Sequence, residues 1–222
     1  MTAADEGGQG IRAVLKPPHA VAAVLREHGA ATVLEAAGAE ARWLPGIRPL
    51  SSYATLAGPA YPVSAPPADN LPLHRALAFC PAGVVLVAAT CGTSGTAIWG
   101  EVLTVAAQER GVAGLVTDGA VRDVRAIRDL GFPVFASGTS PAGPLKSHPG
   151  DLAVPIDVAG VRIAPGDWIV GDEDGVVVVP ARELEGTLAR AEARSRREAE
   201  LMERLRQGEL TVDLLGLREG PR

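Results

Sequence analysis

The 222-residue sequence is poor in aromatic residues, since Phe, Trp and Tyr together make up only 4% of it. Hydrophobic residues as a whole reach 47% and charged residues 21%, a balance that excludes general disorder. The core must therefore be built mainly from small aliphatic side chains. The length suits one domain with a sizeable core.

The sequence also lacks an excess of positive charge. It has 21 Lys and Arg against 26 Asp and Glu, a net charge of -5. A nucleic-acid-binding protein usually carries a basic face, so we expect no nucleic-acid partner. Apolar runs such as residues 82–89 are far too short to span a membrane, and the first ten residues are acidic and rich in Gly, unlike a signal peptide. We expect a cytoplasmic protein with no membrane partner.

Several familiar motifs are missing. The two cysteines, Cys80 and Cys91, are predicted to be buried thiols rather than a disulfide. No Cys/His cluster has zinc spacing, there is no Walker A sequence, and residues 92–96 lack the final Gly of a nucleophile elbow. The only lysines, Lys16 and Lys146, lie in the N-terminal arm and in a Pro/Gly loop. That placement disfavours an aldolase that forms a Schiff base on a desolvated lysine.

The middle of the chain alternates apolar runs of strand length with helical segments, which is typical of an α/β fold. The predicted strands are 56–63, 84–88, 113–117 and 134–136, and the predicted helices are 70–79, 99–110 and 122–130. Pro59 and Pro62 favour an edge strand, or a strand interrupted by bulges, at 56–63. Asp118-Gly119 is predicted to be a turn.

The two ends of the chain differ from this middle part. Residues 1–18 are predicted to be an N-terminal arm, followed by two short helices, 19–28 and 30–37, with a break at Gly29. Short strands at 168–170 and 176–179 precede a charged helix over 182–207. No repeat or linker divides the chain, so we expect one α/β domain with its core at 19–180 and a C-terminal helix and tail at 181–222.

Three charged residues stand where predicted strands meet helices: Glu101, Arg122 and Asp123. In open α/β sheets such junctions are the usual place for ligands. The free N–H groups at the start of the helix, near Glu101, Val102 and Leu103, could hold a carboxylate. Arg122 could stabilise an oxyanion or enolate. Asp123 could bind Mg²⁺, a cation that needs only one or two carboxylates and keeps several waters, one of which Glu101 could hold.

A plainer interpretation stays open at this point. Arg122 and Asp123 could simply be exposed residues at a helix start, where the helix dipole favours Asp. Spacing alone indicates a site for an anionic ligand and goes no further.

Several motifs in one order carry a resemblance to a known family. They are residues 56–60, 69–70, 111–123, 131–135, 165–167 and 171–180. Together they resemble the family that contains 4-hydroxy-4-methyl-2-oxoglutarate (HMG) aldolase and the regulator of ribonuclease activity A, the RraA-like family. The resemblance covers roughly residues 20–210.

This resemblance implies a layered β/α sandwich of the RraA-like, swivelling-domain-like type. It also implies a homotrimer or a dimer of trimers with sites between subunits. Carried to this chain, Asp123 would bind Mg²⁺ or Mn²⁺ and Arg122 would contact the keto oxygen of pyruvate. Glu101 would orient a metal-bound water, and the Val102 and Leu103 amides, next to Gly100, would hold the pyruvate carboxylate.

The C-terminal helix separates members of this family from one another. Aldolase members carry a Glu on an extended C-terminal helix that reaches the neighbouring subunit's site, whereas the ribonuclease regulators usually stop earlier. Glu198 matches that Glu best, and Glu200 and Glu203 are alternatives. A charged helix that is merely exposed to solvent, with no Glu that reaches a site, also stays open.

The sequence therefore predicts a metal-dependent carbon–carbon lyase that cleaves a small 2-oxo acid to pyruvate, of the HMG aldolase and oxaloacetate decarboxylase type. Two alternatives stay open: a non-catalytic regulator that binds a ribonuclease or another protein, and a lyase or dehydratase of a specialised pathway. Residues 88–92 lack the Asp-Gly-Gly common in relatives, and this departure bears on the identity of the substrate.

Overall fold

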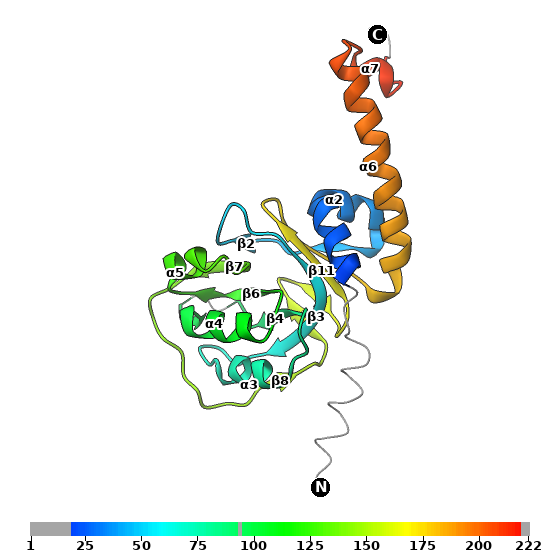
Figure 1. The fold of residues 1–222 in the computed structure, drawn as a ribbon. Helices are drawn as coiled ribbons and strands as arrows, with labels where there is room; N and C mark the ends of the chain where they lie inside the picture. Colours follow the sequence, from blue (N-terminus) through cyan, green and yellow to red (C-terminus); the bar gives the residue numbers. More distant parts are fainter. Residues whose placement is uncertain (1–18, 93–94, 219–222) are drawn as a thin grey trace.

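A curled, ten-stranded sheet runs through the fold, which the computed structural model describes for residues 19–92 and 95–218 (Figure 1). The predicted arm at 1–18 lies outside the described residues. The main path of the sheet has the order β1-β12-β11-β3-β4-β6-β7-β2, with β5 beside β6 and β8 beside β3, and β9 and β10 form a separate hairpin. The strands are β1 (Arg42–Trp43), β2 (Arg48–Pro49), β3 (Leu56–Ser64), β4 (Val85–Ala89), β5 (Ala97–Trp99), β6 (Gly114–Val121), β7 (Val134–Thr139), β8 (Asp151–Leu152), β9 (Ile156–Val158), β10 (Val161–Ile163), β11 (Trp168–Asp172) and β12 (Gly175–Val179).

One half of the sheet is parallel. Strands β3, β4, β6 and β7 run side by side in the same direction. Helices α3 (Leu71–Phe79), α4 (Glu101–Glu109) and α5 (Val124–Asp129) connect the succession and pack on one face of it in a single apolar cluster. The predicted alternation of strands and helices is confirmed. The N-termini of these three helices consequently gather at the carboxyl ends of the strands.

Alternation along the strands separates the core into layers. In β4, Leu86 and Ala88 face the layer of α3, α4 and α5, whereas Val85 and Val87 face an inner layer between the two halves of the sheet. In β12, Val176 and Val178 face that inner layer, while Val177 and Val179 pack under the N-terminal helix. Because neighbouring side chains of a strand point to opposite faces, a run of four valines serves two layers at once. The predicted layered sandwich in one α/β domain is confirmed.

The outermost layer contains α2 (His19–Ala37), followed by the short turn η1 (Gly38–Glu40). Gly29 breaks the helix with φ 78° and ψ 165°, a conformation that glycine adopts readily. The second half starts at Ala30, whose N–H donates to Asp172 Oδ2 at 2.7 Å. The predicted break at Gly29 is therefore confirmed.

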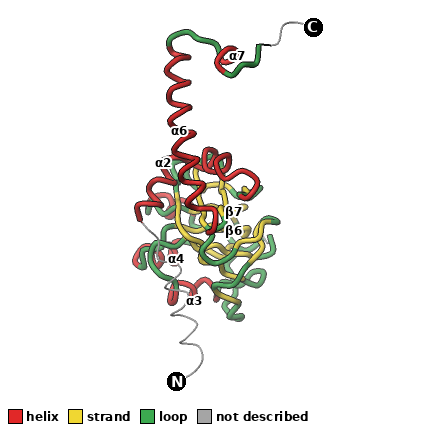
Figure 2. Tube along the Cα trace, turned by 90° about the vertical axis from the view of Figure 1, so that its right-hand side faces the viewer, coloured by secondary structure: helices red, strands yellow, loops and turns green. Residues whose placement is uncertain are grey.

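The C-terminal helix extends away from this body. After η2 (Ala181–Glu183), α6 (Leu184–Arg206) packs with its first part against α2 and then projects outward (Figures 1 and 2). The short helix α7 (Thr211–Leu214) follows at its outer end. The 23 residues of α6 span about 35 Å at 1.5 Å per residue. None of the described helices is both long and apolar enough to cross a membrane.

The strand β3 lies inside the sheet, so its prediction as an edge or bulged strand was wrong. Its first half pairs antiparallel with β11 and its second half pairs parallel with β4. On the side away from β4, β8 pairs only with Val63 and Ser64, and the Pro62 carbonyl accepts a hydrogen bond from the N–H of Ala153, just after β8 ends. No partner strand needs the missing N–H of Pro62, and an interior strand can therefore hold this proline.

The prediction of a turn at Asp118-Gly119 was also wrong, because β6 continues through these residues to Val121. Its register against β7 shifts between Thr117 and Ala120. The Ser137 hydroxyl contacts the carbonyl oxygens of Asp118 (2.7 Å) and Gly119 (3.1 Å), which the irregular pairing leaves free. A bulge of this kind lets a strand pass through residues that are otherwise typical of turns.

Two further expectations need correction. Helix α4 begins at Glu101, because Trp99 belongs to β5, and α5 begins at Val124, after Arg122 and Asp123. The cysteines are free, as predicted, but Cys80 is half-buried and Cys91 is exposed, so the prediction of two buried thiols was wrong.

Candidate functional site

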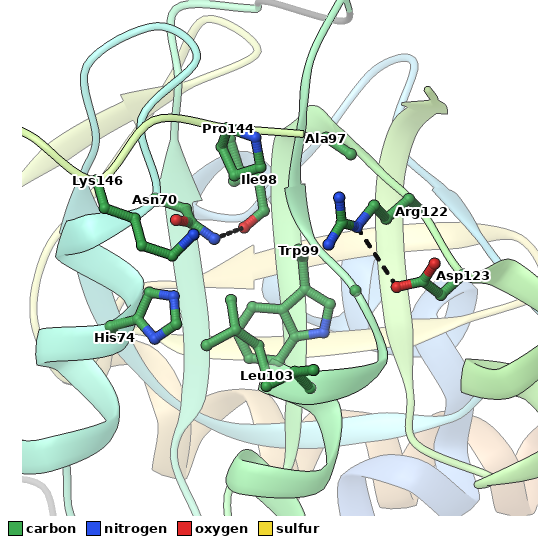
Figure 3. Close-up of a pocket in the computed structure, with 12 residues that line it drawn as sticks. Asn70, His74, Ala97, Ile98, Trp99, Leu103, Arg122, Asp123, Pro144 and Lys146 are labelled. Carbon is green, nitrogen blue, oxygen red and sulfur yellow. Dashed lines mark hydrogen bonds and ion pairs between the residues drawn. The ribbon is translucent and has the colours of Figure 1, made fainter. Parts of the chain in front are cut away.

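A small pocket of about 150 Å³ lies where β5 meets α4, β6 meets α5 and the loop before α3 ends (Figure 3). Five of the predicted site residues line it: Gly100, Val102, Leu103, Arg122 and Asp123. The other lining residues are Asn70, His74, Ala97, Ile98, Trp99, Pro144 and Lys146. The structure thus gathers at one point residues that are far apart in the sequence.

Asp123 stands between β6 and α5 in a left-handed backbone conformation, with φ 56° and ψ 38°. Its side chain does not cap α5, the helix it precedes. Instead, Oδ2 accepts a hydrogen bond from the Glu101 N–H at 3.1 Å, so the carboxylate lies at the N-terminus of α4. Asp123 precedes α5 but its carboxylate contacts the start of α4. This argues against the interpretation of Asp123 as an exposed residue that only favours the start of its own helix.

Arg122 lies beside that carboxylate. Its Nε is 3.5 Å from Asp123 Oδ2, and its backbone N–H donates to the Trp99 carbonyl at 2.9 Å. The guanidinium points into the pocket above Trp99 (Figure 3). Gly143 leaves room for it, because a Cβ on that residue would lie 3.0 Å from Arg122 Nη1. The side chains of Arg122 and Asp123 are 43% and 39% exposed, so both can meet a ligand from solvent.

The floor of the pocket is rigid. The buried indole of Trp99 stacks on Phe132 with ring centroids 6.2 Å apart, and its Nε1 donates to Thr104 Oγ1 at 2.8 Å. That hydroxyl in turn donates to the Gly100 carbonyl at 3.1 Å. A buried chain of hydrogen bonds with every member satisfied holds the turn between β5 and α4 in one conformation.

The first turn of α4 offers backbone donors to the pocket. The N–H of Glu101 is taken by Asp123, while those of Val102 and Leu103 have no partner among the described residues. Free N–H groups at a helix N-terminus bind anions such as carboxylates. Of the three N–H groups predicted to hold an anion, those of Val102 and Leu103 are therefore available, whereas that of Glu101 binds Asp123.

Three polar side chains form the wall opposite Arg122, which we call the far wall: Asn70, His74 and Lys146 (Figure 3). Asn70 is only 6% exposed, and its amide donates to the Ile98 carbonyl at 3.0 Å. Its Oδ1 is buried with no partner among the described residues. Burial, and secondarily the charge of Lys146, lower the pKa of His74 below its usual 6.5. His74 is thus a neutral ring at neutral pH.

The far wall was missed by sequence reasoning. The pair Asp69-Asn70 offered a signal, since it stands directly before a helix. Lys146 offered none, because it lies in a loop after β7 and reaches the pocket only through long-range contacts.

Two predicted catalytic residues do not line this pocket. The Glu101 side chain is exposed, and only its N–H takes part in the contacts at the site. Glu198 lies on the outer part of α6, where Arg194 Nη2 contacts Glu198 Oε1 at 2.7 Å and also pairs with Glu35. Figure 1 places that part of α6 well away from α4. Within one chain, the structure does not bring Glu198 to Asp123.

The chemistry of the donor set decides which metal ion the pocket suits. Asp123 Oδ1 has no hydrogen bond or ion pair within the described residues, and no group of three His, Cys, Asp or Glu residues occurs among them. A closed zinc site needs four protein ligands and is not present there. A hard cation such as Mg²⁺, which keeps several waters and is held by one or two carboxylates, fits the single free carboxylate oxygen.

Comparison with known proteins gives a consistent result. A family model described as "RraA-like: Aldolase/RraA" matches residues 27–178. A Halalkalibacterium halodurans protein named "Putative 4-hydroxy-4-methyl-2-oxoglutarate aldolase" is 41% identical over 145 residues, which cover 65% of this chain and 69% of that protein.

Solved structures are similar as well. An unusual member of the RNase ES inhibitor RraA family from Streptomyces coelicolor has a TM-score of 0.70 and 29% identity, over 85% of this chain and 97% of that one. The RNA-processing inhibitor RraA from Thermus thermophilis has a TM-score of 0.59 and 32% identity, over 64% of this chain and 88% of that one.

Proposed function

This chain belongs to the RraA-like (Aldolase/RraA) family, and from that premise we propose that it is a divalent-metal-dependent lyase. It would cleave a carbon–carbon bond of a small 2-oxo acid and release pyruvate. One observation supports this proposal above all: the pocket joins a carboxylate with a free oxygen, a guanidinium and two unpaired helix N–H groups.

Each of these groups has a part in the proposed reaction. The N–H groups of Val102 and Leu103 would bind the carboxylate of the 2-oxo acid, which orients the substrate across the pocket. The Arg122 guanidinium would donate to the keto oxygen. Asp123 would hold Mg²⁺ or Mn²⁺, which, when bound, supplies a Lewis acid for the same oxygen.

The reaction needs a place for the electrons of the broken bond. In the aldol cleavage a base takes the proton of the C4 hydroxyl, the C3–C4 bond breaks, and its electron pair moves to the keto oxygen as an enolate. Arg122 would stabilise that negative charge. Protonation at C3 then gives pyruvate. With oxaloacetate, the same bond breaks with loss of CO₂, so both activities are expected from one pocket.

The base would be a water molecule held by a carboxylate, and two carboxylates are candidates for that role. Glu101 begins α4 beside the pocket, while Glu198 stands on the projecting part of α6 and would serve the pocket of a second copy. We therefore propose an assembly of several copies, a homotrimer or a dimer of trimers, in which α6 reaches a neighbour. A helix about 35 Å long, whose second part extends beyond its own body, suits that role.

A second candidate function is protein binding without catalysis. Two similar structures, one described as the RNA-processing inhibitor RraA and the other as an unusual member of the RNase ES inhibitor RraA family, favour this alternative. A lyase or dehydratase acting on a larger 2-oxo acid is a further alternative.

The deciding experiment measures pyruvate release from HMG and from oxaloacetate with Mg²⁺, with Mn²⁺ and with EDTA. The variant Asp123→Asn removes the charge and keeps the shape of the side chain. We expect activity that EDTA and Asp123→Asn each abolish, and heat of Mg²⁺ binding in calorimetry that the variant loses. Folded protein that binds no metal and releases no pyruvate would favour the protein-binding alternative.

A further inference from the structure

Asp69 is a buried acid next to the pocket but outside its lining. Its side chain is only 1% exposed, and it immediately precedes Asn70 of the far wall. A buried carboxylate is costly unless its oxygens are well hydrogen-bonded, so the partners of Asp69 indicate what it does.

Those partners come mainly from the segment 145–148, which we call the lysine segment. Oδ2 of Asp69 accepts from the N–H groups of Ser147 (2.8 Å) and His148 (2.9 Å), and His148 Nδ1 lies 3.2 Å away. Oδ1 accepts from the N–H of Leu71 at 2.9 Å. Burial alone would raise the pKa of Asp69, but the hydrogen bonds from Leu71, Ser147 and His148 lower it to about 2. The group is therefore ionised under any ordinary assay condition.

Backbone contacts hold the other end of the lysine segment. Leu145 N–H donates to the Ala68 carbonyl at 2.8 Å, and Asn70 N–H donates to the Leu145 carbonyl at 3.0 Å. Lys146 therefore lies between two anchored residues, Leu145 and Ser147. Its ammonium extends toward Asn70 and His74 (Figure 3).

Apolar packing does not hold the lysine segment in place. All four residues of the lysine segment are exposed, and Leu145 is 62% exposed. Arg75 contacts the carbonyl oxygens of Pro149 and Gly150, beyond the segment. Among the described residues, Asp69 is the one side chain that bonds to Ser147 and His148.

We infer that Asp69 is a positioning residue: its carboxylate fixes the backbone beside Lys146, so that the ammonium stands at the far wall to bind an anionic group on the departing part of the substrate. This inference rests on the proposed function, because it assumes that the pyruvate unit occupies the opposite end at Arg122. The far wall would then set which 2-oxo acids bind well. The bond-breaking step would remain with Arg122 and Asp123.

The test compares two reactions. Oxaloacetate carries a second carboxylate, whereas exchange of the methyl protons of pyruvate with D₂O needs only the Arg122 end. We expect Asp69→Asn to raise KM for oxaloacetate roughly tenfold with little change in kcat, as loss of a charge-assisted contact would. Pyruvate exchange should stay within about twofold. Lys146→Met should give the same pattern, and the double variant should be no worse than either single one, because both act through one contact.

A matched control is Asp167→Asn. Asp167 also accepts two backbone N–H groups, from Ala164 and Ala181, but does not line the pocket. It should leave both reactions unchanged. Amide hydrogen exchange gives a readout that is independent of activity: Ser147 and His148 should lose protection in Asp69→Asn and keep it in Asp167→Asn.

The possible outcomes separate this inference from the proposed function. Wild-type protein that catalyses neither reaction contradicts the proposed function, and the amide exchange still tests the positioning role. Unchanged protection at Ser147 and His148 overturns the inference. So does a normal KM in Lys146→Met beside a raised KM in Asp69→Asn, and so does an equal fall of kcat in both reactions.

Discussion

Gly100 and Asp123 approach so closely that a Cβ on residue 100 would lie 2.5 Å from Asp123 Oδ2. The same Cβ would lie 3.1 Å from Cγ of Arg122. The φ of Gly100 is −165°, an extended conformation that any residue adopts, so space and not backbone strain requires glycine here. The turn before α4 thus leaves room for the two charged side chains of the site.

Gly100→Ala should therefore impair catalysis with little effect on the fold. The added methyl group must push the Asp123 carboxylate away from the Glu101 N–H, and a displacement of about 1 Å can cost about 100-fold in rate. We expect kcat/KM for oxaloacetate to fall by about that factor and the affinity for Mg²⁺ to fall as well. Steady-state kinetics and calorimetry measure the two effects.

The control for this variant is Gly138→Ala. Gly138 lies on β7, and a Cβ there would meet nothing within 4 Å. It should leave activity and metal affinity unchanged. Equal effects of the two substitutions would mean that a general loss of backbone freedom, and no local clash, explains the result.

Glu198 provides a prediction about assembly. If it serves a neighbour's pocket, Glu198→Gln and Asp123→Asn should each be nearly inactive alone, since general acid–base groups contribute roughly 10²–10⁴-fold. Copies of the two variants, mixed in equal amounts during assembly, should regain about a quarter of wild-type activity, because half of the pockets keep Asp123 and half of those meet an intact Glu198. Pyruvate release before and after mixing measures this recovery.

Glu200→Gln on the same helix is the matched control and should remain active. If Glu200→Gln or Glu203→Gln is the inactive variant instead, the role proposed for Glu198 belongs to that residue. If mixing restores no activity, Glu198 does not act across a subunit boundary.

The depressed pKa of Asp69 predicts a pH dependence of stability. Its pKa is about 2 in the folded protein against an ordinary value of 3.8, so the folded state holds the ionised form more tightly. The resulting stability is fully present above pH 4 and is lost as the pH falls toward 2. Urea unfolding should show Asp69→Asn clearly less stable than wild type at pH 6, with the difference shrinking between about pH 4 and 2. A difference that stays constant over that range would contradict the assignment.

The two thiols should react at very different rates. Burial, only partly opposed by the charge of Arg110, raises the pKa of Cys80 to about 11, whereas Cys91 is exposed. At pH 8 only about one Cys80 in a thousand would be a thiolate, the form that reacts. A disulfide reagent should therefore label one thiol rapidly, and Cys91→Ser should remove that rapid phase. Equal rates for both thiols in the folded protein would contradict this expectation.

Much of the fold could be predicted from local patterns. Apolar runs bounded by Gly and Pro gave the parallel strands, and Gly29 gave the break in α2. The errors lie where long-range contacts override a local signal. Asp118-Gly119 is typical of a turn, yet both residues lie in β6 at a bulge. Ser137 on the neighbouring strand β7 donates to the carbonyl oxygens that the bulge leaves unpaired. Pro62 is typical of an edge strand, yet β3 lies inside the sheet. Pro62 falls between the residues that pair with β11 and those that pair with β8, so no strand pairing requires its missing N–H.

The candidate site was predicted unevenly for the same reason. Gly100, Arg122 and Asp123 sit at strand-to-helix junctions, a position that the sequence shows directly. Lys146 reaches the pocket because Asp69 anchors the lysine segment. Asp69 and Ser147, which hydrogen-bond to each other, are 78 residues apart in the sequence. A contact of that range leaves no periodic trace in the sequence, and only the folded chain shows it.

The left-handed backbone of Asp123 limits how this position can change over evolutionary time. Asn and Gly tolerate that conformation, whereas other residues resist it at a cost of roughly 1–2 kcal/mol. A descendant could therefore abandon metal chemistry in one mutational step to Asn or Gly while the rest of the pocket kept its shape. We expect this single position to divide the enzymes from the purely binding proteins among chains of this architecture.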